Sequence, residues 1–283
     1  MLRIAIPNKG SLSVPASEML REAGYRQRSQ AKELVVEDPR NGIEFFFLRP
    51  RDIAVYVGSG RLDIGITGRD LLIDSGAAAE EILTLGFAPS SFRFAGAPGM
   101  AATVHDLAGK TIATSFVGIV EKYLAEHGVA AAGIVHLDGA VETALRLGVA
   151  DVIADVVETG STLRTLGLTT IGEPIMESEA IVIRPAGARP AQDSERLFLR
   201  RLDSVLIARR YVLMDYDIRT SDVERAITFT PGLESPTVSP LHREGWVAVR
   251  AMVPADQAQT IMDKLESAGA RAILITQIHA CRV

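Results

Sequence analysis

The chain has 283 residues, and 30 lysines and arginines against 35 aspartates and glutamates give it a formal charge of −5. This mild acidity argues against a nucleic-acid-binding protein, because phosphate contacts need a surplus of basic side chains. A hydrophobic content of 47% excludes a disordered or fibrous chain. The length predicts about two or three domains, and the single cysteine, Cys281, excludes a disulfide framework and a cysteine metal cluster.

The sequence shows neither a membrane span nor an export signal. No stretch approaches the roughly 20 apolar residues that a bilayer-crossing helix needs. The apolar run at residues 4–6, followed closely by Lys9, is too short for the hydrophobic segment of a signal peptide. We therefore expect a protein of the cytoplasm that contacts no membrane.

Short apolar strands alternate with helical patterns through the first part of the chain. Residues 2–6 and 44–48 are typical of buried strands, and residues 13–23 are typical of a helix. Pro50 opens a further helix. This alternation predicts an α/β fold with largely parallel sheets.

Two segments repeat a pattern of a helix, a glycine turn, one aspartate and a strand. They are residues 53–67 and 141–155, at an offset of 88 positions. The openings of the two halves match as well, since residues 4–10 resemble residues 112–118 at an offset of 108. Two similar α/β lobes with a ligand cleft between them explain both matches. The alternative is a chance similarity between ordinary α/β sequences.

The last part of the chain follows a linker rich in proline and alanine at residues 184–190. Its predicted elements are a helix at 191–208, a strand at 211–218, a helix at 221–228, strands at 237–241 and 246–253, a helix at 256–268 and a strand at 272–278. After the first helix, the βαββαβ order is the ferredoxin-like pattern of small ligand-sensing modules. We place three domains, at residues 1–90 with 180–211, at 91–179 and at 212–283.

The most informative segment is a loop that suits a phosphate group. An apolar strand ends in Asp155, and the residues Thr159, Gly160, Ser161 and Thr162 open a helix. Backbone N–H groups at a helix start favour an anion, and the hydroxyl groups add donors. The glycine allows close approach of the backbone, and the aspartate can accept hydrogen bonds from ribose hydroxyls. The alternative is an ordinary helix start capped by threonine or serine.

A longer pattern surrounds this loop. Its residues are Glu142, Gly148, Ala150, Ile153, Asp155, Thr159, Gly160, Thr162 and Leu163. The pattern resembles the signature of the ATP phosphoribosyltransferases, which catalyse the first step of histidine biosynthesis. Residues 3–10, 46–50 and 63–68 resemble the same family, and residues 230–237 resemble the regulatory domain of its long form.

The resemblance implies a fold, a reaction and a regulator. The fold is a two-lobed, periplasmic-binding-protein-like catalytic core with a C-terminal ferredoxin-like domain. The reaction displaces pyrophosphate from C1 of phosphoribosyl pyrophosphate by N1 of the ATP adenine, with Mg²⁺ carried by the pyrophosphate. Histidine is implied as a feedback inhibitor, and the oligomer is implied to change from a dimer to a hexamer.

The resemblance also assigns the substrate-binding residues. Asp155 and residues 159–162 are expected to bind phosphoribosyl pyrophosphate. Lys9, Arg49 and Asp70 are expected on the side of ATP and the leaving pyrophosphate. The alternatives are solvated surface cations for the two basic residues and a helix N-terminal carboxylate for Asp70. The sequence identifies no general base and no metal site built from protein ligands alone.

The regulatory site is expected in the last domain. By resemblance, Asp217 pairs with the ammonium group of histidine, and Thr237 and the backbone near Ala272 complete the site. The alternatives are that the aspartate caps the following helix and that the threonine only begins a strand.

The sequence departs from the pattern of the resembled family at two points. Phe116 and Val117 stand where family members often carry Tyr-Pro, so a role for that tyrosine hydroxyl is in doubt. Glu158 lies in the phosphate loop and is expected to point outward.

Three other functions are alternatives to this one: a solute-binding protein, a porphobilinogen-polymerising enzyme and an inactive regulatory subunit. The missing export signal argues against a solute-binding protein. The lack of a cysteine in the body of the chain argues against the porphobilinogen-polymerising enzyme, and the intact phosphate loop argues against the inactive subunit.

Overall fold

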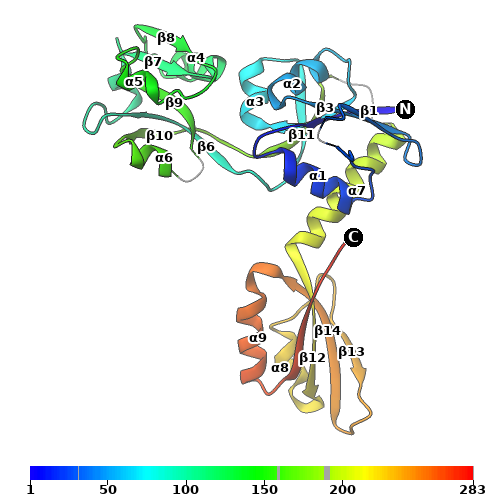
Figure 1. Cartoon of the computed structure of the whole chain (residues 1–283). Helices are drawn as coiled ribbons and strands as arrows, with labels where there is room; N and C mark the ends of the chain where they lie inside the picture. Colours follow the sequence, from blue (N-terminus) through cyan, green and yellow to red (C-terminus); the bar gives the residue numbers. More distant parts are fainter. Residues whose placement is uncertain (31, 158–159, 188–191, 283) are drawn as a thin grey trace. The chain divides into compact units, whose positions relative to one another are not determined.

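The computed structural model describes residues 1–30, 32–157, 160–187 and 192–282 (Figure 1). The chain divides into two compact units, Met1–Glu18 with Arg26–Ser194 and Met19–Tyr25 with Glu195–Val283. Among the described residues, no helix has both the length and the apolar character that crossing a lipid bilayer requires.

The first lobe of the larger unit is built on a six-stranded sheet of order β2-β3-β1-β4-β11-β5. Its strands are β1 (Leu2–Pro7), β2 (Val35–Asp38), β3 (Ile43–Leu48), β4 (Ile64–Gly68), β5 (Ala79–Thr84) and β11 (Ala180–Pro185). The helices are α2 (Pro50–Gly58), α3 (Arg69–Ser75) and the first part of α1 (Ser13–Glu22), whose residues from Met19 on belong to the smaller unit. The strands predicted at 2–6 and 44–48, the first helix and the helix that Pro50 opens are confirmed.

The second lobe is built on a five-stranded sheet of order β10-β6-β9-β7-β8. Its strands are β6 (Ser90–Gly96), β7 (Thr111–Thr114), β8 (Gly133–His136), β9 (Val152–Val157) and β10 (Thr169–Ser178). The helical segments are η1 (Val104–Leu107), α4 (Val117–Glu126), α5 (Thr143–Arg146) and α6 (Ser161–Thr165). Buried Phe92, Phe94, Ile112 and Val152 form the centre of a core against α4.

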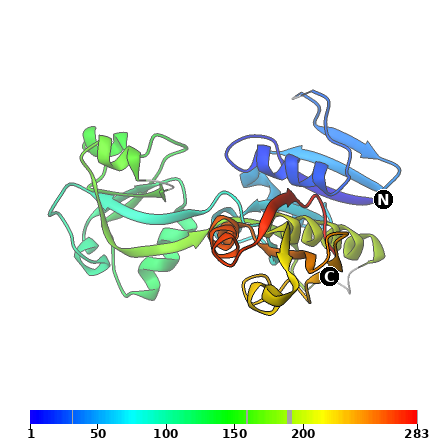
Figure 2. The ribbon, with the colours of Figure 1, turned by 90° about the horizontal axis from the view of Figure 1, so that it is seen from below.

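The prediction of largely parallel sheets is wrong. The β1/β3, β1/β4, β7/β8 and β7/β9 pairs are parallel, but the remaining pairs of these two sheets are antiparallel. One antiparallel pair, β2/β3, joins two consecutive strands of the first lobe. The others involve β6, β10 and β11, which flank the passages of the chain between the lobes, and Figure 2 shows β6 and β10 as the long strands joining the lobes. A strand that returns from the other lobe enters its sheet against the direction of its neighbours.

Each lobe contains an aspartate that is hydrogen-bonded to the backbone at the start of a strand, and this shared feature explains the internal repeat. The carboxylate of Asp63 accepts a hydrogen bond from the backbone N–H of Arg3 at 2.8 Å, and Asp151 does the same for Thr111 at 2.8 Å. Each aspartate also donates its own N–H to the carbonyl of that partner at 2.9 Å. The aspartates are 88 positions apart and their partners 108 apart, the offsets found in the sequence. In each lobe the pair therefore fixes the start of one parallel strand beside another.

The smaller unit carries α7 (Asp193–Arg210), which begins just before it, and an antiparallel sheet of order β13-β14-β12-β15. The strands are β12 (Tyr211–Arg219), β13 (Thr237–Pro240), β14 (Trp246–Pro254) and β15 (Arg271–Gln277), and the helical segments are η2 (Thr220–Asp222), α8 (Val223–Ile227), η3 (Ala255–Gln257) and α9 (Ala258–Ser267). The βαββαβ order is confirmed. Figure 1 shows α8 and α9 on one side of this sheet, where Met214, Tyr216 and Leu265 are buried.

We propose that the three sheets mark three domains, with the borders that the sequence analysis gives. The first sheet takes its strands from residues 2–84 and 180–185, the second from 90–178 and the third from 211–277. These ranges support a first lobe at 1–90 with 180–211, a second at 91–179 and a last domain at 212–283.

Candidate functional site

A cavity of about 390 Å³ lies at the end of β9 in the second lobe. Asp155 lines it together with the start of α6, and its described lining residues are Glu142, Ile153, Asp155, Val156, Val157, Gly160, Ser161, Thr162 and Leu163. The structure therefore brings together four of the five residues of the expected phosphate loop. Thr159 lies outside the described residues, as does Glu158 with its expected outward orientation.

The start of α6 depends on Gly160. This residue has φ +67°, the left-handed conformation that residues with a side chain rarely adopt. A glycine cap supplies no side-chain acceptor to the first-turn N–H groups of the helix. The helix start thus relies on other acceptors, and the oxygens of a phosphate group are suited to that role.

Asp155 is a poorly solvated carboxylate that lines this cavity. Burial raises the pKa of its carboxyl group, and the nearby charge of Glu142 raises it further. The backbone N–H of Val156 donates a hydrogen bond to it at 2.8 Å and opposes that shift. A carboxylate that has lost water gains most from hydrogen-bond donors on a ligand, such as the hydroxyl groups of a sugar.

A second cavity, of about 210 Å³, opens beside the first. It is lined by Lys9, Gly10, Ser11, Leu12, Pro50, Gly68, Asp70, Leu71, Ala88, Ser90, Phe116, Val156, Ser178 and Glu179. Val156 lines both cavities, so the two are neighbours. Lys9 and Asp70 are thus brought together, whereas Arg49 is an exposed residue at the start of α2 and does not line this cavity.

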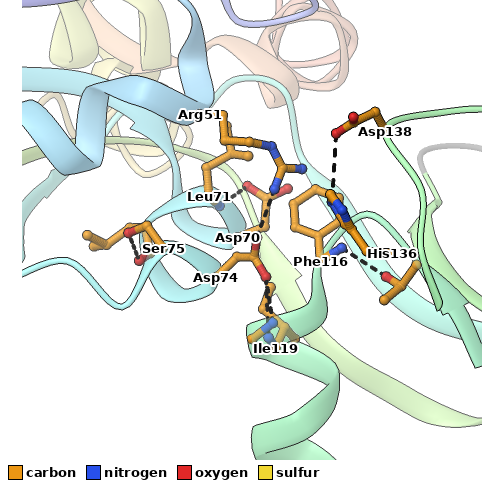
Figure 3. A network of polar contacts seen from close by, with 12 residues as sticks. Arg51, Asp70, Leu71, Asp74, Ser75, Phe116, Ile119, His136 and Asp138 are labelled. Carbon is orange, nitrogen blue, oxygen red and sulfur yellow. Dashed lines mark hydrogen bonds and ion pairs between the residues drawn. The ribbon is translucent and has the colours of Figure 1, made fainter. Parts of the chain in front are cut away.

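Asp70 belongs to the first turn of α3 and is only 9% exposed. Burial raises the pKa of its carboxyl group, while hydrogen bonds from the backbone of Leu71, at 2.9 Å, and from Ser178 oppose the shift. Its own N–H donates to the hydroxyl oxygen of Ser178 at 3.1 Å. Figure 3 shows the carboxyl group turned back onto the N–H of Leu71.

Glu179, which lines this cavity, shares one arginine with a second carboxylate. Arg69 donates to both carboxylate oxygens of Glu81, at 2.8 and 2.7 Å, and reaches Glu179 at 3.3 Å. The hydrogen bond with Glu81 is the main cause of the raised pKa of Arg69. Lys9 and Asp70 therefore remain as the two charged lining residues outside this ion-paired group.

Phe116, at which the sequence departs from the pattern of the family that it resembles, is a buried aromatic residue. Its ring is 7% exposed, lines the second cavity and packs edge-on against Phe92 at 5.1 Å between ring centroids. The guanidinium of Arg51 lies 4.8 Å from the ring centroid. Sequence reasoning missed the arginine and also Ser178, which lies 108 positions from Asp70 and becomes its neighbour only through the sheet.

The three residues expected to bind histidine lie on the last sheet. Asp217 pairs with Ala248 of β14 and with Arg271 of β15. The register of β12 and β15 shifts at this point, and Ala272, just inside the irregularity, has φ +50°. Thr237 begins β13 and lines a separate cavity of about 360 Å³ that includes neither of the other two residues.

Asp217 and Thr237 share the sheet face that α8 and α9 leave uncovered. Asp217 is opposite Ala248, which is opposite Ser239, and Thr237 is two residues from Ser239 on the same strand. Because side chains alternate along a strand, residues two apart lie on one face. The neighbouring Tyr216 points the other way and bonds to the buried hydroxyl of Thr230 at 2.8 Å.

Two family models match the chain. The model described as ATP phosphoribosyltransferase matches residues 49–204, and the model described as HisG, C-terminal domain, matches residues 208–280. The ATP phosphoribosyltransferases of Streptomyces avermitilis and Streptomyces coelicolor are each 68% identical to the chain over the whole of both proteins. A chain of the ATP phosphoribosyl transferase (HisG:HisZ) complex from Thermotoga maritima is 28% identical, with a TM-score of 0.64 over 73% of this chain and 99% of that one.

The raised pKa of Asp155 predicts how stability depends on pH. The folded chain holds this proton more tightly than the unfolded chain, so stability falls as pH rises from the ordinary aspartate pKa through the raised folded value. Asp155→Asn cannot ionise, so at neutral pH it should melt higher than wild type, by roughly 2–4 °C for each kcal/mol recovered. Calorimetric scans from pH 4 to 8 measure the effect.

Asp106→Asn is the control of opposite sign. Hydrogen bonds from the backbone of Thr103 and Ala102 and from the Thr103 hydroxyl lower the pKa of Asp106. Its ionised form therefore stabilises the fold above the ordinary aspartate pKa, and Asp106→Asn should melt lower than wild type at neutral pH. Equal or lower melting of Asp155→Asn at pH 7 contradicts the description of Asp155.

Proposed function

The chain belongs to the ATP phosphoribosyltransferase family, and from that premise we propose that it transfers the phosphoribosyl group of phosphoribosyl pyrophosphate to N1 of ATP, the first step of histidine biosynthesis. The observation that carries this proposal is that the cavity of Asp155 and the cavity of Asp70 are neighbours that share Val156. Two cavities of this kind suit a reaction that must bring two substrates into contact.

The reaction needs accurate placement of two bound molecules. The lone pair of adenine N1 forms a bond to C1 of the ribose while the bond from C1 to the pyrophosphate oxygen breaks, and pyrophosphate leaves with that electron pair. Holding both reactants in this geometry can lower the barrier by roughly 7–11 kcal/mol in favourable cases. The protein therefore acts mainly by binding and orienting, and we assign no general base.

Each cavity is proposed to hold one substrate. Residues 159–162 bind the 5′-phosphate, and Asp155 accepts hydrogen bonds from the ribose hydroxyls. Lys9 and Arg49 meet the triphosphate or the leaving pyrophosphate. Asp70, a buried carboxylate beside the shared wall, lies on the side of the adenine nucleotide. Its oxygens are suited to accept a hydrogen bond from the adenine amino group.

Magnesium is proposed to arrive with the substrate. Among the described residues, no three His, Cys, Asp or Glu side chains are grouped to hold a metal ion. Magnesium usually binds through one or two carboxylates together with waters and substrate phosphates, and the cavity of Asp155 offers the carboxylates of Glu142 and Asp155. The donor set therefore fits. When bound, the ion supplies positive charge to the pyrophosphate.

Histidine is proposed as a feedback inhibitor that binds the last domain. The uncovered face of the sheet carries Asp217 and Thr237, and the backbone irregularity at Ala272 lies beside the aspartate. A carboxylate, a hydroxyl and backbone groups released from strand pairing are the donors and acceptors that an amino acid needs. A remote ligand inhibits only if it binds one state of the protein better, typically by about 1–3 kcal/mol.

Assembly and location complete the proposal. We propose a cytoplasmic homo-oligomer that changes between a dimer and a hexamer, with histidine favouring the hexamer. Family membership supports this, as does the supply of ATP and phosphoribosyl pyrophosphate inside the cell. The Thermotoga maritima relative is itself part of a complex.

The direct test of the activity is incubation of the chain with ATP, phosphoribosyl pyrophosphate and Mg²⁺. We expect equimolar formation of pyrophosphate and phosphoribosyl-ATP, identified by its mass. Binding of both substrates without either product contradicts the proposal and indicates an inactive regulatory subunit.

Thr162→Ala tests the phosphate loop. The substitution removes a hydrogen-bond donor to a charged group, worth roughly 1.5–3 kcal/mol. Calorimetry should show phosphoribosyl pyrophosphate binding about ten- to a hundredfold more weakly, with ATP binding little changed. Thr165→Ala is the matched control on the same helix, because that hydroxyl is already bonded to the carbonyl of Ser161 at 3.0 Å. Unaltered affinity in Thr162→Ala excludes the assignment.

Arg49→Ala tests whether the arginine after β3 meets a substrate. If its guanidinium binds the triphosphate or the pyrophosphate, turnover should fall by roughly tenfold or more, with an unchanged melting temperature. Arg40→Ala is the control, since it removes another exposed cation of the same lobe before β3. Wild-type kinetics in a folded Arg49→Ala chain would leave this residue a surface cation.

Asp217→Ala tests the histidine site. The loss of the carboxylate should raise the histidine concentration that gives half inhibition by roughly tenfold or more, while turnover without histidine stays unchanged. Asp263→Ala, on α9, is the control. Initial rates are measured against histidine at several concentrations of phosphoribosyl pyrophosphate. Strict competition between the two, or no inhibition of wild type, contradicts a separate regulatory site.

A further inference from the structure

The carboxylate of Asp74 forms hydrogen bonds between the two lobes of the larger unit. Asp74 belongs to α3 of the first lobe, and its Oδ1 accepts hydrogen bonds from the N–H groups of Gly118 and Ile119, at 3.0 and 3.4 Å, at the start of α4 in the second lobe. Figure 3 shows the carboxylate aimed at this helix start. A negative charge is favourable there, because first-turn N–H groups lack partners within their own helix.

The second oxygen of the same carboxylate holds an arginine. Oδ2 of Asp74 lies 2.9 Å from a guanidinium nitrogen of Arg51, which comes from α2. That guanidinium also lies over the ring of Phe116, the residue that precedes α4. Arg51 thus contacts the first lobe through its ion pair and the second lobe through the ring. The Asp74 side chain is only 11% exposed, so water screens this ion pair less than it screens an ordinary surface pair.

The helices also approach each other closely. A Cβ atom at Gly118 would lie 2.7 Å from the backbone oxygen of Asp74, which leaves no room for any side chain. Nearby, Leu71 of α3 packs against the hydrophobic core of the second lobe. The contact between the lobes is therefore built from backbone, charge and apolar packing together.

This contact is continuous with the second cavity. Phe116 and Leu71 line that cavity, and so does Asp70, whose carboxylate feels the charge of Arg51. Asp74 itself lines neither cavity, so its substitution changes the contact between the lobes without removing a lining residue.

We propose that Arg51, Asp74 and Gly118 form a clasp that sets the separation of the lobes, and through it the distance between adenine N1 and ribose C1 when both substrates are bound. The three are positioning residues. The proposal rests on the proposed function, because it concerns how two bound substrates meet.

Asp74→Ala tests the clasp by separating binding from turnover. Asp74 lines neither cavity, so the dissociation constant of each substrate, measured alone by calorimetry, should stay within about threefold of wild type. A misplacement of about 1 Å can cost about a hundredfold in rate, so kcat should fall by roughly ten- to a hundredfold. Asp52→Ala, which removes the exposed carboxylate next to Arg51 in sequence, is the control and should keep the wild-type kcat.

Gly118→Ala provides a second variant that leaves every charge in place. The added methyl group should push α3 and α4 apart and lower kcat in the same way. This variant replaces Asp74→Ala in the test if Asp74→Ala does not fold. Wild-type kcat in a folded Asp74→Ala or Gly118→Ala chain overturns the proposal. So does a parallel loss of affinity for one substrate, because it would make Asp74 part of a binding site.

A distance measurement tests whether the clasp sets the separation of the lobes, without any assay of activity. Spin labels are placed on Val55 of α2 and on Leu147 of the second lobe, which are 55% and 75% exposed, in a chain carrying Cys281→Ser. Labelled chains are mixed with an excess of unlabelled ones. Pulsed dipolar spectroscopy should give a broader or longer distribution in Asp74→Ala than in wild type, and an unchanged one overturns the proposal. An inactive wild type would instead contradict the proposed function.

Discussion

Two polyanionic substrates must be held so that one adenine nitrogen reaches one ribose carbon, and this need for alignment governs how the lobes are built. Asp155 and Asp70 are poorly solvated carboxylates on different lobes, and their cavities meet at Val156. The cavity of Asp155 is lined by the second lobe, whereas residues of both lobes line the cavity of Asp70. The chemistry therefore depends on the contact between lobes as much as on the residues that touch substrate.

The scaffold that holds these carboxylates could be predicted well from the sequence. The repeated aspartates Asp63 and Asp151 bond to the starts of β1 and β7, and their spacing in the chain is what made the repeat visible. Local patterns also predicted the strands of the last domain in the correct order, because alternation, glycine turns and helix ends are written in neighbouring residues.

The rest of the site could not be predicted, because it depends on residues brought together from distant parts of the chain. Ser178 reaches Asp70 across 108 positions, and Asp74 reaches α4 across 44. The antiparallel pairs of β10 and β11 arise from the passage of the chain between lobes, which no local pattern records. A local pattern can also mislead. Arg49 follows a strand as Lys9 does, but it does not line the cavity that Lys9 lines.

A crystal structure with phosphoribosyl pyrophosphate bound tests the roles of the two cavities directly. We expect the 5′-phosphate at Gly160, Ser161 and Thr162, the ribose hydroxyls within hydrogen-bond distance of Asp155, and C1 facing the cavity of Asp70 across Val156. A 5′-phosphate bound instead beside Lys9 in the cavity of Asp70, with no contact between Asp155 and the ribose, would contradict the proposed roles of the two cavities.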